Sequence, residues 1–314
     1  MKNISLLMPS ISVVAPARNE EGNITEFLKL TTETLKKLTN DWEIIIVNDN
    51  SLDKTTELFN SFAKNYRQLK ILTNRRRLGV TSSLWNGISA AQKDIIVFLP
   101  VDLESNPQED IPKLVMALSN NSDFVAGWRQ KKKVGIVKSI TTKILYFLSK
   151  FLFGLDLHDP SWIKAFRREI LKEIPNLRSD WQKFFAVIVH DKGFNVSEVK
   201  TNWYPRTHGC SNFGRFGLRR IPDSFFDLLN LWFILNFSKK PMHIFGFCGI
   251  FLFMIGFLTG LYILYANYVL LIDIKRHVPL IIFSELLIFT GVQLLAIGFL
   301  AELFISTKDT SQND

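Results

Sequence analysis

The sequence has little of what several common enzyme classes require. It contains two cysteines, Cys210 and Cys248, which cannot build a disulfide framework and favour a reducing compartment. It has no glycine-rich dinucleotide fingerprint, no phosphate-binding loop with its lysine, and no cysteine–histidine metal cluster. These absences argue against dinucleotide-dependent oxidoreductases, P-loop enzymes and structural zinc domains.

Charge is missing from a long stretch near the C-terminus. Residues 241–272 contain no Asp, Glu, Lys or Arg, and a second apolar run, 278–306, is interrupted only by Glu285 and Glu302. A helix crosses a bilayer with about 20 apolar residues, so two transmembrane helices are predicted. The alternative is a pair of buried core helices. It is disfavoured because polar faces are missing over about twice the usual helix length.

The positive charge is concentrated in the middle of the chain. The net charge is −1 over residues 1–128, +12 over 129–220 and −2 over 221–314. Two amphipathic helices lying in an anionic membrane interface are predicted around this block, one within 136–152 and one at 225–237. Core packing of these apolar stripes is the alternative. Nucleic acid is not expected as a partner, because basic residues beside lipid-facing runs already have the anionic membrane surface as their partner.

The N-terminal part alternates strand and helix patterns. Met1–Pro9 is too short and too weakly charged for a signal peptide, so export of this part is not expected. The strand-like runs are rich in Ile and Val and nearly continuous in hydrophobicity, which is typical of a parallel sheet covered on both faces. The predicted strands are Ile11–Ala15, Glu43–Val47, Lys70–Thr73, Asp94–Leu99 and Phe124–Ala126.

Four helices are predicted between these strands. The first carries an apolar stripe from Ile24 to Leu38, the second is capped by Asp53 and runs toward Tyr66, and the third covers Thr81–Ala91. The fourth opens at Asn106-Pro107-Gln108-Glu109, a capping box with proline at the first helical position. This order predicts an open α/β sheet that binds ligands beyond the carboxyl ends of its strands.

Polar side chains follow three of the predicted strands. The segments are Pro16-Ala17-Arg18-Asn19-Glu20-Glu21, Asn48-Asp49-Asn50-Ser51 and Pro100-Val101-Asp102-Leu103-Glu104. Each alone is ordinary turn chemistry. Three at the same sheet edge predict a binding site there.

These runs, together with Lys164-Ala165-Phe166-Arg167-Arg168 and Tyr204-Pro205-Arg206-Thr207-His208, resemble glycosyltransferase family 2. Within it, they are similar to the dolichol-phosphate-mannose synthase group with its bacterial polyprenyl-phosphate glycosyltransferases. The resemblance implies a GT-A-type, mixed and mainly parallel sheet. It also implies inverting transfer of a sugar from a nucleotide diphosphate donor to a polyprenyl phosphate in a membrane. The Gln-x-x-Arg-Trp signature of processive polysaccharide synthases is absent, which favours a single transfer.

The resemblance also implies roles for individual residues. Asp102 is expected to act in catalysis and to hold Mg²⁺ or Mn²⁺ against the diphosphate, where a cation stabilises the charge growing on the departing nucleotide. The expected nucleotide-sugar site consists of Pro16, Ala17, Arg18, Asn19, Glu20, Asp49, Ser51, Val101 and Asp102.

An anionic polyprenyl phosphate acceptor accounts for the excess of basic residues between positions 129 and 220. Arg129, Arg206 and Ser211 are expected near the acceptor phosphate or the donor diphosphate, since Arg forks suit phosphate oxygens. Asp159 matches an acidic family position and is expected to orient the nucleophile, although it can also be read as a turn residue before Pro160. A phosphate oxygen is already deprotonated, so no strong general base is required.

Two positions depart from the family pattern. The family usually has Asp-x-Asp after the fourth strand, and here Pro100 replaces the first Asp. Glu104 is expected to supply a substitute carboxylate for the metal. Arg18 stands in place of the usual Tyr. The alternatives are therefore a family 2 transferase with another lipid or glycan acceptor and a catalytically degenerate membrane scaffold.

The expected location is the inner membrane, as a multi-pass protein with two spans and the catalytic domain in the cytoplasm. Lys239-Lys240 before the first span supports this orientation by the positive-inside rule, whereas Lys275-Arg276 in the outer loop argues against it. Scattered glycines in the spans permit a homo-oligomer. The expected parts are a catalytic domain (1–215), a juxtamembrane segment (216–240), two spans (about 242–270 and 279–305, within 241–306) and a polar tail (307–314).

Overall fold

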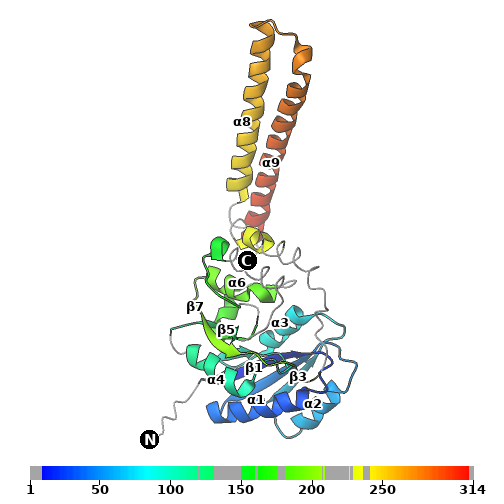
Figure 1. The fold of residues 1–314 in the computed structure, drawn as a ribbon, viewed down its shortest axis with the longest axis vertical. Helices are drawn as coiled ribbons and strands as arrows, with labels where there is room; N and C mark the ends of the chain where they lie inside the picture. The colour runs from blue at the N-terminus through cyan, green and yellow to red at the C-terminus, as the bar shows by residue number, and fades with distance from the viewer. Residues whose placement is uncertain are drawn as a thin grey trace. The chain divides into compact units, whose positions relative to one another are not determined.

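The computed structural model describes residues 9–118, 121–130, 150–159, 162–174, 181–206, 208, 226, 229–235 and 241–310. The chain divides into two compact units, Met1–Leu228 and Leu229–Asp314, and Figure 1 draws both as ribbons. The finer boundaries expected at 215 and 240 stay predictions.

The first unit is built on a seven-stranded mixed sheet in the order β3-β2-β1-β4-β6-β5-β7. Only β6 runs antiparallel to its neighbours, β4 and β5. The predicted mainly parallel sheet is therefore confirmed. Its strands are β1 (Ile11–Ala17), β2 (Trp42–Asn48), β3 (Leu69–Thr73), β4 (Ile95–Phe98), β5 (Phe124–Gln130), β6 (Lys164–Arg167) and β7 (Val196–Asn202).

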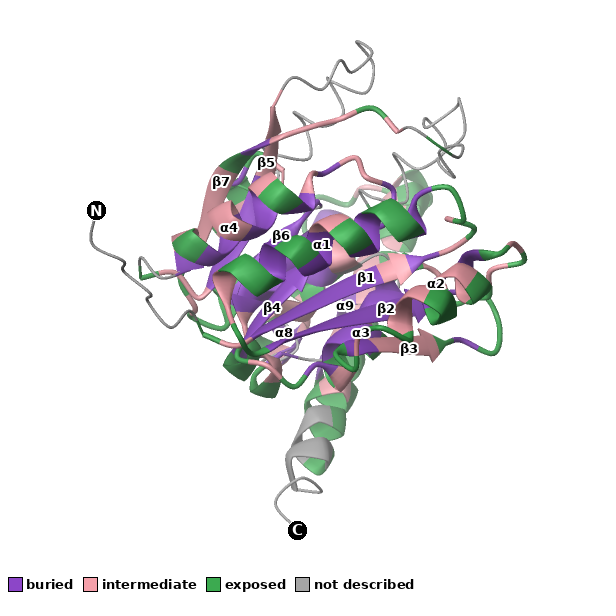
Figure 2. Ribbon diagram, turned by 90° about the horizontal axis from the view of Figure 1, so that it is seen from below, coloured by how far each residue is buried: buried purple, intermediate pink, exposed green. Residues whose placement is uncertain are grey.

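Helices cover both faces of this sheet. α1, α2 and α4 lie on one face, and α3 and α6 lie on the other (Figure 1). Figure 2 shows the buried strands behind α1 and α4, whose outward sides are exposed. The helices are α1 (Ile24–Leu38), α2 (Thr55–Ala63), α3 (Val80–Ala90), α4 (Pro107–Leu118) and α6 (Phe185–Asp191), with short 3₁₀ turns at Arg168–Lys172 and Trp181–Phe184.

At two of the expected helix starts the named side chain accepts a backbone hydrogen bond, although the N–H of Asn106 donates to Asp110 and not to Glu109 of the expected capping box. The Asp53 carboxylate accepts from the backbone N–H of Thr55 at 3.1 Å, although the helix ends at Ala63 and not near Tyr66. The Asn106 side chain accepts from the N–H of Gln108 at 3.0 Å, directly before Pro107 at the first position of α4. Both side chains satisfy N–H groups that the first helical turn leaves without partners.

The direction of the strands determines where the loops meet. Because β1, β2, β4, β5 and β7 all point the same way, their carboxyl ends lie at one edge of the sheet. The antiparallel β6 begins at this same edge, since Lys164 is paired with Phe98 at the end of β4. The segment after β5 is also the one that leads into β6, so with the parallel strand β3 included, six connections meet the sheet at this edge.

Asp110 in the first turn of α4 gives a stability prediction. It is fully buried, and burial raises its pKa to about 7. The folded state thus holds the proton more tightly than the unfolded state, whose pKa is about 3.9, so the free energy of unfolding falls as pH rises from about 4 to about 7. Asp110→Asn keeps the shape and is expected to raise stability at pH 8, by up to about 4 kcal/mol at about 1.4 kcal/mol per pKa unit.

Thermal unfolding of the full chain in detergent, followed between pH 4.5 and pH 8, measures this effect. The gain from Asp110→Asn should shrink as the pH falls toward 4. The matched control is Asp191→Asn at the exposed end of α6, which should change little with pH. An equal gain from Asp110→Asn at every pH would contradict the assignment.

The second unit contains two long apolar helices, α8 (Pro241–Tyr268) and α9 (Val278–Thr310), joined through a 3₁₀ turn at Ile274–His277. Both are long and apolar enough to cross a membrane, so the two predicted spans are confirmed as helices. They pack closely where glycines meet, because a Cβ on Gly249 would lie 2.8 Å from the carbonyl oxygen of Gly291.

Most of the predicted interfacial segments fall outside the described residues. Residues 131–149, which carry most of the first amphipathic stripe, are not described. Of the second segment, residues 229–235 are helical, with Leu231 buried and Phe233 exposed. The interfacial role of both stays a prediction.

Candidate functional site

The loops after β1 and β2 are joined by reciprocal hydrogen bonds. The N–H of Asn19 donates to the Ser51 hydroxyl at 3.1 Å, and the Asn19 side-chain oxygen accepts from the N–H of Leu52 at 2.9 Å. Nearby, the N–H of Glu20 donates to the Thr55 hydroxyl at 2.9 Å. The two segments predicted to bind the nucleotide therefore form one structure, with the start of α2 as its support.

Three strand-end loops contain a residue in the left-handed backbone region. Asn19, Asn50 and Leu103 have φ values of 55°, 57° and 56°. Asn tolerates this region, but a leucine there is strained. Such strain concentrates at ligand sites held in place by surrounding structure. Leu103 separates Asp102 from Glu104, so its conformation determines how these two carboxylates are presented.

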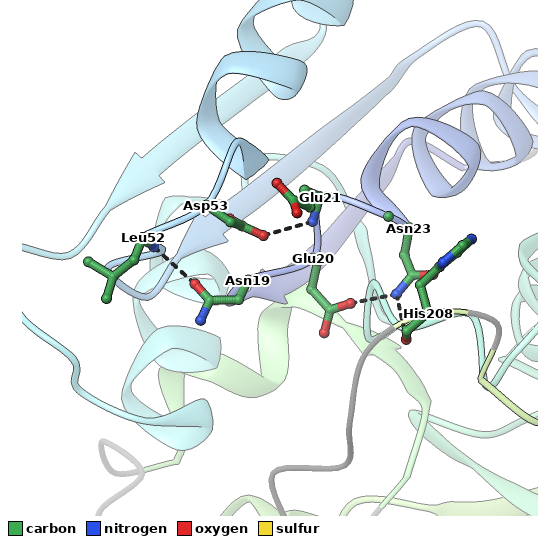
Figure 3. Close-up of a pocket in the computed structure, with 8 residues that line it drawn as sticks. Asn19, Glu20, Glu21, Asn23, Leu52, Asp53 and His208 are labelled. Carbon is green, nitrogen blue, oxygen red and sulfur yellow. Dashed lines mark hydrogen bonds between the residues drawn. The ribbon is translucent and has the colours of Figure 1, made fainter.

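A cavity of about 460 Å³ opens beside the first two loops (Figure 3). Gly22 forms part of its wall, and a Cβ there would lie 2.7 Å from the Cβ of His208, so only glycine fits without displacing that residue. The Asn23 amide joins the two sides by donating to the Glu20 carboxylate at 2.7 Å and to the His208 carbonyl at 3.3 Å. The lining residues are Asn19, Glu20, Glu21, Gly22, Asn23, Leu52, Asp53 and His208.

Asp49 is at the same edge, but its carboxylate is already bonded. It accepts from the backbone N–H groups of Leu78 (2.7 Å) and Gly79 (2.9 Å) and from the Asn74 amide (2.9 Å). Although burial opposes the charge, these donors hold the pKa of Asp49 below its usual value. Asp49 therefore fixes the loop that leads into α3.

The loop after β4 carries a three-membered charge cluster. Arg206, which follows β7, pairs with Asp102 through one guanidinium nitrogen and with Glu104 through Nε at 3.0 Å. The side chains of Asp102, Glu104 and Arg206 are only 10%, 19% and 19% exposed. The Tyr204 N–H also donates to the Glu104 carbonyl at 2.9 Å. The two carboxylates thus converge on one point, which the guanidinium occupies.

The cluster and the cavity are electrostatically connected. Burial raises the pKa of Asp102, and Arg206 opposes that rise. Burial likewise raises the pKa of Glu20, the hydrogen bond from Asn23 opposes it, and Asp102 adds to it. Glu20 lines the cavity, so its negative charge and that of the cluster act on the same space. A cation or a cationic side chain is favoured between them.

A second ion pair lies at the end of β5. Arg129 contacts both carboxylate oxygens of Asp159, with Nη2 at 2.9 Å from Oδ1. The guanidinium carbon also lies 5.0 Å from the centre of the Trp162 ring. Asp159 immediately precedes the loop into β6, so this bidentate pair fixes the guanidinium of Arg129 at the edge of the sheet.

Lys164 is a residue of this region for which the sequence predicted no role. It is fully buried, donates to the carbonyl of Gln182 at 3.0 Å and lies over the rings of Phe98 and Phe185. Burial lowers its pKa to about 7, and Asp159 opposes that shift. The available signal was a lysine inside an otherwise apolar strand, directly after Trp162-Ile163.

Most of the predicted site residues lie at this one edge. Arg18 also has a buried Nε for which no described residue is a hydrogen-bond partner. Ser211 lies outside the described residues. The sequence missed Asn23, Leu52, Asp53 and His208 as lining residues. The expected residues found at the edge are Pro16, Ala17, Arg18, Asn19, Glu20, Asp49, Ser51, Val101, Asp102, Glu104, Arg129, Asp159 and Arg206.

Two curated relatives are similar over almost the whole chain. Dodecaprenyl-phosphate galacturonate synthase of Rhizobium johnstonii is 27% identical over 312 residues, covering 96% of this chain and 90% of the relative. Undecaprenyl-phosphate 4-deoxy-4-formamido-L-arabinose transferase of Pseudomonas paraeruginosa is 25% identical over 295 residues, covering 93% and 84%.

The fold is also found among solved structures. Glucosyl-3-phosphoglycerate synthase from Mycobacterium tuberculosis, solved with Mn²⁺, uridine diphosphate and phosphoglyceric acid, superposes with a TM-score of 0.54 at 22% identity. The match covers 70% of this chain and 78% of that one. This likeness shows the fold of the sheet and its helices.

The family model for glycosyl transferase family 2 matches residues 12–175, just over half of the chain. The match runs from β1 past β6 and includes the loops that hold Asn19, Asp49 and Asp102. On this match and the architecture of its sheet, the chain belongs to glycosyl transferase family 2.

Proposed function

We propose that this glycosyltransferase moves a sugar from a nucleotide diphosphate donor to the phosphate of a polyprenyl lipid in the membrane, with inversion at the sugar carbon. The observation that carries the proposal is the meeting, at one sheet edge, of a nucleotide-sized cavity, two converging carboxylates and two fixed guanidinium groups. The names of the relatives, both of them polyprenyl-phosphate sugar enzymes, support the acceptor.

The donor is proposed to bind with its nucleoside in the cavity and its diphosphate toward Asp102. Asn19, Glu20 and Ser51 belong to the loops that border this space. The buried Nε of Arg18, which has no described hydrogen-bond partner, supports a polar or anionic ligand nearby. Asp49 would act indirectly, by holding the loop into α3 in place.

The carboxylates fit a divalent cation that is shared with the diphosphate. Asp102 and Glu104 offer hard oxygen ligands at one point, and Mg²⁺ is commonly held by one or two carboxylates plus substrate phosphates and water. Among the described residues, no group of three or more His, Cys, Asp or Glu side chains is able to hold a metal. Bound Mg²⁺ or Mn²⁺ would neutralise charge on the departing nucleotide.

The acceptor side is proposed to use guanidinium groups and no general base. A lipid phosphate carries roughly −1.5 to −2 charges near neutral pH, so its oxygen is already a nucleophile. Arg129, held by Asp159 and stacked on Trp162, is suited to orient that phosphate. Asp159 is thus proposed as the positioning residue for Arg129.

The proposed orientation places this site in the cytoplasm, where nucleotide sugars are made. The two apolar helices support a membrane protein, and Lys239-Lys240 supports a cytoplasmic first unit. Lys275-Arg276 in the opposite loop argues the other way. Whether a cysteine engineered into the first unit is accessible from outside intact cells decides between the two orientations.

A donor panel tests the proposed reaction. Membranes containing the chain are supplied with radiolabelled nucleotide sugars and undecaprenyl phosphate, and the label is expected in a lipid that mild acid hydrolyses. Label that appears only in alkali-stable glycolipid would favour a different acceptor. The absence of label with every donor would favour the degenerate scaffold, for which Pro100 at the first acidic position of the family pattern is the motivating feature.

Removal of divalent cations is expected to stop the transfer. EDTA should reduce the rate to background, and excess Mn²⁺ or Mg²⁺ should restore it, because the diphosphate leaves poorly without charge neutralisation. Glu104→Ala should raise the Mn²⁺ concentration needed for half-maximal rate. An unchanged requirement would show that Glu104 is not a metal ligand.

A further inference from the structure

Alternate residues attach the segment that leaves β7 to the connection between β4 and α4. This exit segment comprises residues 202–206. The Asn202 amide and the Tyr204 hydroxyl each donate to the carboxylate of Glu109, at 3.0 Å and 2.8 Å. Arg206 pairs with the two carboxylates of the loop after β4. Three side chains at two-residue intervals therefore hold the exit segment to acidic groups of one connection.

Glu109 departs from the role that its position in the sequence predicts. In a capping box its carboxylate would accept from the backbone N–H of Asn106. That N–H donates to Asp110 instead, at 3.1 Å. Both carboxylate oxygens of Glu109 are used by the exit segment, because Oε1 accepts from Tyr204 and Oε2 accepts from Asn202. Capping of α4 therefore does not account for this glutamate.

Tyr204 is bonded at both of its ends. At its hydroxyl, Glu109 offers a charged acceptor, because the hydrogen bonds from Tyr204 and Asn202 lower the pKa of that carboxyl. Lys113, 3.5 Å from the same carboxylate, adds to the shift. Hydrogen bonds to an ionised acceptor are stronger than neutral ones. The backbone N–H of Tyr204 donates to the carbonyl of Glu104 at 2.9 Å, so this tyrosine joins the first turn of α4 to the loop after β4.

The anchoring of Tyr204 extends to the guanidinium of Arg206. Only Pro205 separates the two residues, and proline fixes its own φ. The backbone that carries the guanidinium therefore keeps little freedom beside the anchored tyrosine. Fixing an arginine side chain costs rotamer freedom, and a backbone that is held in advance leaves less freedom to lose when the guanidinium binds an anion.

We propose that Glu109 is a positioning residue for Arg206 and acts on it through Tyr204. Its part in sugar transfer rests on the proposed function, in which the guanidinium passes from the carboxylates of Asp102 and Glu104 to the donor diphosphate. While the guanidinium exchanges one anionic partner for another, the anchor keeps its backbone at the edge of the sheet. Preorganised groups stabilise developing charge without rearranging during the reaction, so a loose exit segment would hold the diphosphate less well.

Hydrogen–deuterium exchange of the ligand-free full chain in detergent tests the anchor independently of the reaction. Tyr204→Phe keeps the ring and the backbone N–H but loses the bond to Glu109, and Glu109→Ala removes the acceptor. In each variant the amides of the exit segment should exchange about tenfold faster than in the parent chain. The matched controls are Tyr66→Phe, beside Lys36, and Glu57→Ala, exposed in the first turn of α2. Neither control should change this exchange, and unchanged exchange in both test variants would overturn the proposal.

Mn²⁺ binding shows whether the anchor acts through Arg206. In Tyr204→Phe the loosened guanidinium should compete less for the two carboxylates and receive pyrophosphate less well. Mn²⁺ alone should therefore bind about threefold tighter than to the parent chain, and its gain in affinity from pyrophosphate should fall to about threefold or less. In an Arg206→Gln background, Tyr204→Phe should change neither value.

The outcomes separate this proposal from the proposed function. Weaker Mn²⁺ binding in Tyr204→Phe to the same extent with and without pyrophosphate would indicate a merely structural role and overturn the positioning. An equal effect of Tyr204→Phe in the Arg206→Gln background would overturn it as well. Faster exchange of the exit segment, in a protein whose parent chain binds Mn²⁺ equally with and without pyrophosphate, would support the anchor and contradict the proposed diphosphate site.

Discussion

Asp102→Asn is expected to lower the rate of sugar transfer by about 10³-fold or more while leaving the chain folded. Asp102 lies in the loop after β4, is buried and shares Arg206 with Glu104. Asparagine keeps the size but loses the charge that would hold a cation against the diphosphate. Removing one preorganised electrostatic contact typically costs about 10²–10³ in turnover, and here two functions are lost together, charge balance and cation binding.

The matched control for this variant is Asp94→Asn. Asp94 is exposed and precedes the amino end of β4, where its carboxylate accepts a hydrogen bond from Ser10. This variant therefore removes a carboxylate beside the same strand, but at the end away from the site. Its rate should stay near that of the parent chain. Both variants should unfold near the parent temperature. An Asp102→Asn enzyme that turns over at half the parent rate would remove Asp102 from the mechanism.

Arg206→Gln is expected to have opposite effects on turnover and on cation binding. In the described structure, the guanidinium of Arg206 occupies the point on which Asp102 and Glu104 converge. A cation alone must displace it, whereas a diphosphate offers the guanidinium a new anionic partner. Mn²⁺ should therefore bind the parent chain weakly alone and about tenfold or more tightly with pyrophosphate, a gain of about 1.4 kcal/mol.

In Arg206→Gln this dependence should disappear. Mn²⁺, followed by electron paramagnetic resonance, should bind without pyrophosphate about tenfold tighter than to the parent chain. Sugar transfer should nevertheless fall at least about 10²-fold, because the group that receives the diphosphate is gone. Arg168→Gln, at the opposite end of the sheet near Asp94, is the control and should leave Mn²⁺ binding unchanged. Equal Mn²⁺ affinity in parent and Arg206→Gln would contradict the exchange.

The sequence allowed the central part of the fold to be predicted. β1, β2 and β4 are buried almost throughout, and their continuous Ile and Val runs placed them within two residues. β7 (Val196–Asn202) was missed because it is an edge strand of intermediate burial that mixes Ser, Glu and Lys with Val. The insertion of the antiparallel β6 between β4 and β5 depends on long-range pairing, which no local pattern reports.

The position of the candidate site could be predicted from the sequence, but the contacts between its residues could not. The strand-end loops were expected at one edge, because parallel strands direct their carboxyl ends alike. The partner of Arg206 was not predicted. Arg206 itself was expected beside a phosphate. In the described structure it pairs with the carboxylates of Asp102 and Glu104, which precede it in the sequence by 104 and 102 positions respectively. Arg129 and Asp159 were both named as site residues, but their mutual ion pair spans 30 positions and has no local signal.

A choice between two lipid acceptors shows whether the enzyme requires a lipid phosphate. Purified full-length chain in phosphatidylcholine vesicles, with its preferred donor and Mn²⁺, is offered undecaprenyl phosphate or undecaprenol at equal mole fraction, and lipid products are identified by mass spectrometry. We expect a sugar joined to undecaprenyl phosphate through a phosphodiester and no product with undecaprenol, because the site relies on an acceptor that arrives deprotonated. Comparable transfer to undecaprenol, or transfer to neither lipid while the donor is consumed, would contradict it.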